Sequence, residues 1–140
     1  MTATAHQLEF LAAHRSGVVV TLKKDGRPQL SNVVYHYADG RVRISVTADR
    51  AKTRNAARDP RVSLHVTSPD FWSFVVAEGD AELTPPAGDP HDATVEALID
   101  LYRALSGEHP DWDEYRAAMV ADRRQVLSFA VTHAYGQLPG

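Results

Sequence analysis

The chain of 140 residues contains no cysteine. This absence excludes disulfide bonds, thiolate metal ligands and a cysteine nucleophile. It is compatible with a reducing cytoplasm. The first residues lack a basic stretch followed by an apolar core, so we expect no signal peptide. No apolar run approaches the roughly 20 residues that a membrane helix needs. We therefore expect a cytoplasmic protein without a membrane partner.

The chain also has little excess charge of either sign. Its 15 Lys and Arg and 18 Asp and Glu give a formal net charge of −3, so no global field attracts nucleic acid or an anionic membrane. Its basic residues are not interleaved with aromatic ones, which argues against nucleic-acid binding. Any anion site must be local. The length fits a single domain over residues 1–140.

The familiar catalytic and nucleotide-binding motifs are missing as well. The sequence contains no G-x-G-x-x-G, P-loop, G-x-S-x-G or H-E-x-x-H pattern. Its seven histidines are scattered over separate segments, and we expect no metal site. No residue is assigned a catalytic role on this basis.

Strand-like runs dominate what is present. Asp25-Gly26 and Asp39-Gly40 mark tight turns between alternating apolar segments, which is typical of antiparallel hairpins. Six strands are predicted, over residues 18–22, 29–37, 41–46, 61–67, 71–83 and 126–135, with a bend or bulge at Gly79 in the fifth. The fold class is therefore mainly β (α+β), with about six antiparallel strands in a closed or nearly closed barrel and helices outside it.

Four helices are predicted around these strands. A capping box at Thr4–Gln7 opens the first, and Gly17 is its expected end. The second spans about residues 50–58 and ends at Asp59-Pro60. The third is expected to begin at Asp89-Pro90 and to end at Gly107. Asp111 is the predicted N-cap of the fourth.

The most informative stretch is Arg50-Ala51-Lys52-Thr53-Arg54-Asn55, which follows a predicted strand and opens a helix. Free backbone amides and a partial positive charge gather at such a turn, and three cations add to them. This chemistry suits a phosphate. The alternative is a solvated basic helix whose cations pair with Asp49 and Asp59.

Two further features are open to more than one interpretation. Asn32 alternates with Leu30 and Val34, which are expected to face the core, so its amide must be hydrogen-bonded or face a polar ligand. The group Phe71-Trp72-Ser73-Phe74 fits a core, a dimer face or a platform for a flat ring, and core or interface is favoured.

Several stretches together resemble the split β-barrel family related to pyridoxamine 5′-phosphate oxidase, of the FMN-binding split barrel type. They are GRPQLSNVVYHY, RAKTRNAARDPR, WSFVVAEGDAELTPP, TVEALIDLYRALSGEHPDWDEYRAAM and DRRQVLSFAVTHAYG. The sequence is most similar to the actinobacterial branch that uses the deazaflavin coenzyme F420. The resemblance implies a homodimer with two cofactor sites at its interface.

The resemblance also implies a set of cofactor-binding residues. Arg50, Lys52 and Thr53 would hold the phosphate, together with Arg54 and Asn55. The strand residues Pro28, Gln29, Leu30, Ser31 and Asn32 would line the deazaflavin ring and ribityl chain, and Ser45 and Val46 would complete that wall. Trp72 and Arg124 would approach from the partner subunit. These roles are expectations carried over from the family.

The implied activity is hydride transfer from reduced coenzyme F420 to an unsaturated small molecule, of the biliverdin-like tetrapyrrole or conjugated enone class. No acid–base residue is implied, and Asn32 is the first candidate near the ring. The alternatives are an FMN-dependent oxidase or reductase of the same family, a non-catalytic flavin-, F420- or haem-binding protein, and a structural dimer with an empty groove.

Overall fold

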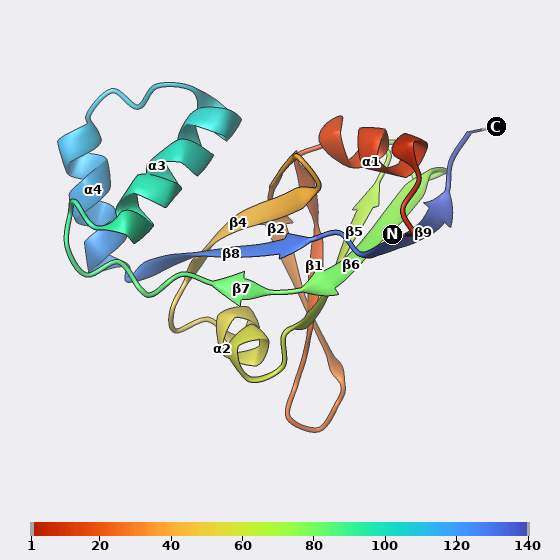
Figure 1. Cartoon of the computed structure of the whole chain (residues 1–140), viewed down its shortest axis with the longest axis horizontal. Coiled ribbons are helices and arrows are strands. Elements are labelled where there is room, and N and C mark those ends of the chain that lie inside the picture. The colour runs from red at the N-terminus through yellow and green to blue at the C-terminus, as the bar shows by residue number, and fades with distance from the viewer. Residues whose placement is uncertain (1, 140) are drawn as a thin grey trace.

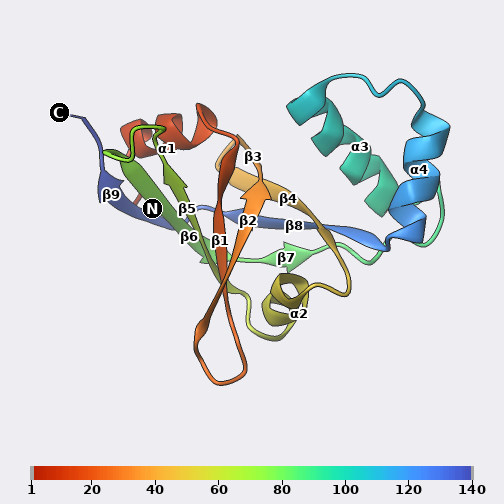
Figure 2. The same ribbon diagram turned by 180° about the vertical axis from the view of Figure 1, so that it is seen from behind.

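Two antiparallel sheets form the body of the protein in the computed structural model, which describes residues 2–139 (Figures 1 and 2). The first sheet has the strand order β2-β1-β5-β6-β9, formed by β2 (Pro28–Val34), β1 (Ser16–Leu22), β5 (Arg61–Thr67), β6 (Phe74–Asp80) and β9 (His133–Gln137). The second has the order β3-β4-β8-β7, formed by β3 (His36–Ala38), β4 (Arg41–Thr47), β8 (Arg124–Ala130) and β7 (Glu82–Leu83). The prediction of a mainly antiparallel α+β fold is confirmed.

Four helices accompany the sheets, and they are placed unevenly. These helices are α1 (Ala5–Ala12), α2 (Ala51–Arg58), α3 (Ala93–Ser106) and α4 (Trp112–Ala121). Figure 1 shows α3 and α4 side by side at one end of the molecule, away from α1 and from both chain ends. None of the helices within residues 2–139 is both long enough and apolar enough to cross a membrane.

The prediction of six strands is wrong, because each of the three long runs divides into two. Residues 29–37 become β2 and β3, residues 71–83 become β6 and β7, and residues 126–135 become β8 and β9. In every case the two halves lie in different sheets. At two of the breaks a backbone amide forms a hydrogen bond outside the strand ladders. Ala81 N donates to the Pro60 carbonyl (2.7 Å), and Val131 N donates to the Gly40 carbonyl (2.9 Å). The chain thus passes repeatedly from one sheet to the other.

Gly79 permits a close approach of two backbones and does not form the expected bend or bulge. The β5–β6 register is continuous, with Gly79 opposite Val62. A Cβ atom at Gly79 would lie 2.2 Å from the carbonyl oxygen of Ala130 at the end of β8. No side chain fits that distance, so glycine is required where β6 and β8 pass each other.

Alternating apolar residues of the strands fill the space between the sheets. Val42, Ile44 and Val46 of β4 are buried, and so are Leu127 and Phe129 of β8, which pair with Ile44 and Val42. A second, smaller cluster joins α3 and α4 to the other face of β8; its buried members include Val95, Leu98, Ile99, Met119 and Val126. The outward face of β8 is therefore covered by the helical pair.

The observed end of α1 and the observed start of α3 correct two of the predictions. The capping box at Thr4 and Gln7 is confirmed, but α1 ends at Ala12, and Gly17 lies inside β1, where a Cβ would be 2.8 Å from the His65 carbonyl oxygen. The N-cap of α3 is Asp92 instead of Asp89, because the Asp92 carboxylate accepts from Val95 N at 2.8 Å.

The remaining helix ends follow the sequence. Gly107 ends α3 with a φ of 78°, and Asp111 caps α4 by accepting from Glu114 N. Helix α2 begins after Arg50 and ends before Asp59.

Candidate functional site

Helix α2 starts without a capping side chain, directly after strand β4. Its N-cap is Arg50, which makes no side-chain cap bond, so the amides of the first turn lack the acceptor that a Ser, Thr, Asp or Asn would supply. The Thr53 hydroxyl donates to the Thr47 carbonyl at 2.7 Å and fixes the turn from strand to helix. The start of α2 thus presents amide donors and the positive end of its dipole.

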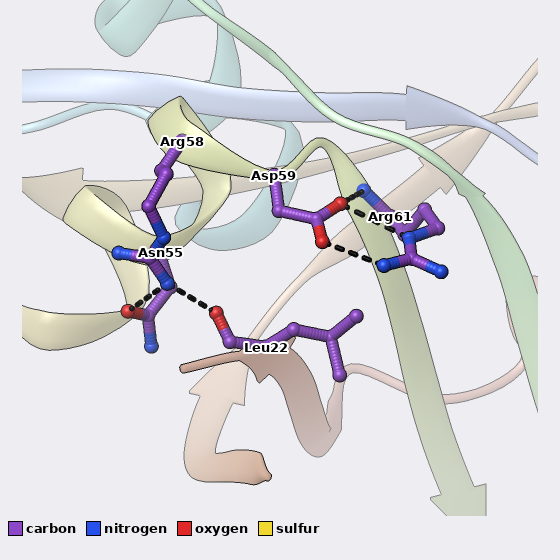
Figure 3. Close-up of polar contacts among 5 residues, drawn as sticks. All are labelled: Leu22, Asn55, Arg58, Asp59 and Arg61. Atoms are coloured by element: carbon purple, nitrogen blue, oxygen red, sulfur yellow. Dashed lines mark hydrogen bonds and ion pairs between the residues drawn. The ribbon is translucent and has the colours of Figure 1, made fainter. Parts of the chain in front are cut away.

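The cations of this turn lack carboxylate partners. Among residues 2–139, Arg50, Lys52 and Arg54 form no ion pair within 4 Å. Asp59 does not pair with them, because it accepts two bonds from the Arg61 guanidinium, at 3.1 and 2.8 Å (Figure 3). The structure therefore contradicts the alternative in which Asp49 and Asp59 pair with the cations of this helix.

Arg124 at the start of β8 adds another cation beside this turn. Its Nη1 donates to the Ser45 hydroxyl at 3.2 Å, but its Nε is buried and has no hydrogen-bond partner. The nearest carboxylate oxygen, on Asp122, lies 3.9 Å from Nε, which is too long for a hydrogen bond. A buried charged donor without an acceptor is costly, and an added anion would satisfy it.

Two adjoining cavities meet at Arg124. The first, which we call the basic groove, has a volume of about 690 Å³ and is lined by the turns before α2 and β8, including Arg50, Arg54, Arg123 and Arg124. The second, the apolar groove, has a volume of about 370 Å³ and lies between β2, β4 and α3. Its polar lining includes Asn32, Ser45, Lys52 and Arg124. An elongated ligand could place an anionic end in the first and a flat apolar part in the second.

Lys52 shows the electrostatic character of this junction. Its pKa lies below the ordinary lysine value, first because partial burial disfavours the ammonium ion and then because Arg50 and Arg124 repel it. The positive charges thus lie close enough to repel one another, and within residues 2–139 neither Arg50 nor Lys52 has a carboxylate within 4 Å. Such an arrangement favours binding of an anion.

Six of the expected cofactor residues line these two grooves. Arg50 and Arg54 border the basic groove, Asn32, Ser45 and Lys52 border the apolar groove, and Arg124 borders both. Arg124 reaches them within its own chain, where it bonds to Ser45, so the expectation that it comes from a partner subunit is not needed.

Other expected residues have side chains that point elsewhere. Val46 and Thr53 are buried, and Val46 belongs to the core between the sheets. The Asn55 amide donates to the Thr21 hydroxyl at 3.2 Å and accepts from Arg58 at 3.1 Å, and Arg58 also donates to the Leu22 carbonyl (Figure 3). Asn55 therefore ties α2 to the sheet. Pro28, Gln29, Leu30, Ser31 and Trp72 border neither groove.

The outer face of β2 is exposed, which corrects the expectation that Leu30, Asn32 and Val34 face the core. Leu30 is 59% exposed and Val34 56% exposed, and β2 is an edge strand of its sheet. Phe71 and Trp72 are 79% and 76% exposed, so the core interpretation of that aromatic group is wrong too. Large apolar side chains gathered on a surface mark an interaction face.

Part of the apolar groove was not expected from the sequence. Tyr102 and Leu105 of α3 and Tyr115 and Met119 of α4 line it, and none of them was given a role in a site from the sequence. The Tyr115 hydroxyl donates to the Leu98 carbonyl at 3.1 Å, and burial raises its pKa to about 12. The sequence held one signal for this part of the groove. Tyr102 and Tyr115 lie among the apolar residues of the two helices, and a tyrosine hydroxyl needs a hydrogen-bond partner.

Within residues 2–139, no group of three or more His, Asp or Glu side chains is placed to hold a metal ion.

Comparison with solved structures shows the same fold in several proteins. A protein named F420 reductase is 23% identical, with a TM-score of 0.67, over 95% of this chain and 98% of that chain. A conserved hypothetical protein from Mycobacterium tuberculosis is 23% identical, with a TM-score of 0.73, over 100% and 91% of the two chains. A heme binding protein from Mycobacterium smegmatis is 22% identical, with a TM-score of 0.69, over 98% of this chain and 55% of that one.

A sequence model described as pyridoxamine 5′-phosphate oxidase matches residues 3–138, which is nearly the whole chain. The two antiparallel sheets with their exchanged strand halves agree with the split barrel expected for that match. The chain therefore belongs to the pyridoxamine 5′-phosphate oxidase family and has its split β-barrel fold.

Proposed function

We propose that this protein is a coenzyme F420-dependent reductase of an unsaturated small molecule, and that the cofactor phosphate binds at the start of α2. The observation that carries the proposal is the close approach of Arg50, Lys52 and Arg124 beside a helix start that has no capping side chain. The similarity to a protein named F420 reductase supports the choice of cofactor.

The residues present fit a phosphate-bearing, flat cofactor. The buried Nε of Arg124 lacks an acceptor, and the first turn of α2 lacks a cap, so an anion there would satisfy both. The apolar groove continues from this point between Asn32 and Ser45 on the strands and Tyr102 on α3. Its mixed apolar and amide lining suits a ring with polar edges.

In this proposal the protein positions the reactants and excludes water. Arg50, Lys52 and Arg124 hold the phosphate, Ser45 keeps Arg124 in place, and Asn32 hydrogen-bonds the polar edge of the ring. The reduced deazaflavin supplies a hydride when bound. The aliphatic and aromatic side chains of α3 and α4 keep the apolar groove dry, which strengthens every polar contact in it.

We further propose that the functional unit is a homodimer. Leu30 and Val34 leave an exposed apolar face on the edge strand β2, and Val34 also borders the apolar groove. A second subunit on this surface would cover the groove and complete the ring site. Leu30, Ser31 and Trp72 would then contribute near the interface.

The competing assignment is an FMN-dependent oxidoreductase, because the family is that of pyridoxamine 5′-phosphate oxidase. A non-catalytic haem-binding role is a third possibility, motivated by the similarity to a heme binding protein. The F420, FMN and haem assignments differ in the ligand that the protein is expected to bind.

The decisive experiment is equilibrium binding of coenzyme F420, FMN and haem to the purified protein, compared with the Lys52→Ala variant. We expect micromolar or tighter binding of F420, weaker binding of FMN and haem, and a loss of at least about tenfold in F420 affinity in the variant. Lys24→Ala, in the exposed hairpin between β1 and β2, is the matched control. Preference for FMN or haem, or an unchanged affinity in Lys52→Ala, would contradict the proposal.

A further inference from the structure

The helices α3 and α4 belong to an insertion between β7 and β8, residues 84–123, whose two ends lie side by side. Thr84 N donates to the Val126 carbonyl at 3.1 Å, and the Thr84 hydroxyl accepts from Val126 N at 2.9 Å. Ala87 N donates to the Arg124 carbonyl at 2.8 Å. The insertion therefore leaves the barrel and returns to it at one place, so a small change of backbone angles there can swing both helices together.

The half of the helical pair that lies far from this junction packs on itself. Tyr102, His109, Trp112 and Tyr115 form one aromatic cluster, in which the ring centroids of Tyr102 lie 5.1 Å from Tyr115 and 5.7 Å from Trp112. Figures 1 and 2 show the connection between α3 and α4 arching away from both sheets. The cluster that joins the helices to the barrel, in contrast, includes Val126 at the junction itself. The two helices therefore form one unit that is attached at one end.

Helix α3 has a cavity on each of two flanks. One is the apolar groove, of about 370 Å³, and the other is a third cavity, of about 460 Å³, which we call the outer groove. Leu98, Tyr102 and Leu105 line the first, Ala97, Asp100 and Ala104 line the second, and Leu101 lines both. Close-packed elements leave no spaces of this size between them. Helix α3 thus rests on the sheet along a narrow band that includes Leu101.

One hydrogen bond fixes the far end of α3 to the barrel. Arg15 Nη1 donates to the Leu105 carbonyl at 2.5 Å, in the last turn of the helix, where carbonyls lack helical partners and a cation is favoured. The Arg15 carbonyl accepts from the amide of the fully buried Tyr35 at 2.8 Å, so its backbone is held by the core. Among residues 2–139, every other hydrogen bond between the insertion and the rest of the chain involves Thr84, Ala87 or Arg123, at the two ends of the insertion.

We propose that α3 and α4 form a hinged lid over the apolar groove, and that Arg15 is the positioning residue that holds this lid closed. The inference rests on the proposed function for the occupant of the groove, which is the deazaflavin ring. When the lid swings away, Leu98, Tyr102 and Leu105 leave the strand side of the groove, and a flat ligand can enter or leave. Arg15 does not line the groove, so it acts through the position of α3 alone.

Amide hydrogen exchange of the protein without cofactor tests the lid directly. We expect amides of α3 and α4 to exchange faster than those of β5, because the lid opens while the barrel stays folded. Arg15→Ala should accelerate exchange in α3 and α4 about fivefold and leave β5 unchanged. Arg15→Lys keeps a cationic donor and should restore most of the protection. Arg27→Ala, which removes an exposed guanidinium from the β1–β2 hairpin, is the matched control and should have no effect.

Three results of this experiment would overturn the proposal. The first is exchange of α3 and α4 at the rate of β5 in the native protein, which would mean that the helices open only when the barrel unfolds. The second is unchanged exchange in Arg15→Ala. The third is an equal acceleration in α3, α4 and β5, because Arg15 would then stabilise the whole fold and not the lid.

Stopped-flow binding of coenzyme F420 tests whether the lid controls the groove. Arg15→Ala should raise the rate constants of association and dissociation together, each about fivefold, with Kd changed less than about twofold, because a gate alters passage in both directions. A change in dissociation alone would indicate a direct contact with the ligand and would contradict the lid. If F420 does not bind, the proposed function fails, whereas the exchange pattern still decides whether the lid exists.

Discussion

Three neighbouring polar residues of α2 have different roles, and their burial distinguishes them. Lys52 borders a groove, whereas Thr53 and Asn55 are buried and bond to the strands. All three belong to one basic, amide-containing segment in the sequence. The difference arises because the helix presents only part of its surface to the groove.

Asn55 is expected to matter for stability more than for binding. Asn55→Ala removes the one side chain among residues 2–139 that hydrogen-bonds the fully buried Thr21 hydroxyl, and it should lower the free energy of unfolding by about 1–3 kcal/mol. Urea unfolding measures the loss. Asn32→Ala, on the exposed face of β2, is the control and should stay within about 0.5 kcal/mol of the native protein. An equal loss in both variants would refute the structural role of Asn55.

Lys52 should make cofactor binding depend on pH. Its pKa is lowered in the free protein, and a bound phosphate would raise it again, so binding takes up a proton between the two values. Affinity is then highest below the free-protein pKa and falls as pH rises through it. Titrations of coenzyme F420 at a series of pH values above neutral measure this.

Lys52→Arg provides the control for that dependence, since a guanidinium stays charged throughout the range. The variant should bind F420 with an affinity that barely changes over the same pH series. If the native protein and the variant show the same slope, Lys52 is not the group that titrates.

The sequence predicted the cations of the site better than its apolar walls. Arg50, Lys52 and Arg124 stand out as charged residues, and the resemblance gave each a role. Tyr102 and Tyr115 did not stand out, because a helical stripe looks the same whether it faces a core or a groove. Val46 was expected to line the cofactor site because it lies next to Ser45 in sequence. Its side chain is buried instead, since neighbouring strand residues face opposite sides.

At the scale of elements, the main difference from prediction is the division of the three long strands. Period-2 alternation predicts where strands lie, and β4 and β5 confirm the strands predicted over residues 41–46 and 61–67. It does not show which sheet a strand enters. In residues 126–135 the positions buried in the core between the sheets are Leu127, Phe129, Val131 and then Ala134, so the phase shifts at the break. Only knowledge of burial reveals that shift.

Gly79 is the element-scale position most sensitive to substitution. Gly79→Ala would place a Cβ 2.2 Å from the Ala130 carbonyl oxygen, and separating the backbones of β6 and β8 should cost about 2–3 kcal/mol of unfolding free energy. Thermal or urea unfolding measures it. Gly88→Ala is the matched control, because its nearest neighbour would be 3.9 Å away. Comparable stability of the two variants would contradict the close approach.

At the scale of the whole molecule, the exposed apolar residues of β2 are the basis of the proposed association. Leu30 and Val34 could have been predicted as outward-facing only if β2 were known to be an edge strand. In the sequence their alternation indicated a core face. A surface that a second subunit covers has the composition of a core, so the pattern alone does not separate the two.

Leu30→Glu should weaken the proposed dimer. Burying a carboxylate in an apolar interface is costly, so we expect the variant to sediment as a monomer at concentrations where the native protein sediments as a dimer. Analytical ultracentrifugation measures the masses. Lys24→Gln changes the net charge by the same amount in an exposed turn and should leave the mass unchanged. A native protein that is monomeric at all concentrations would refute the dimer.

The passage of the chain between the sheets at β2–β3, β6–β7 and β8–β9 has a consequence for how the molecule opens. The two sheets also bury one shared core, so opening either sheet would expose apolar residues of the other. Amide hydrogen exchange in the two sheets should therefore proceed through one shared opening event of the same free energy. The pair α3 and α4, inserted between β7 and β8, has its own small cluster and can open first, exposing the grooves without disturbing the barrel.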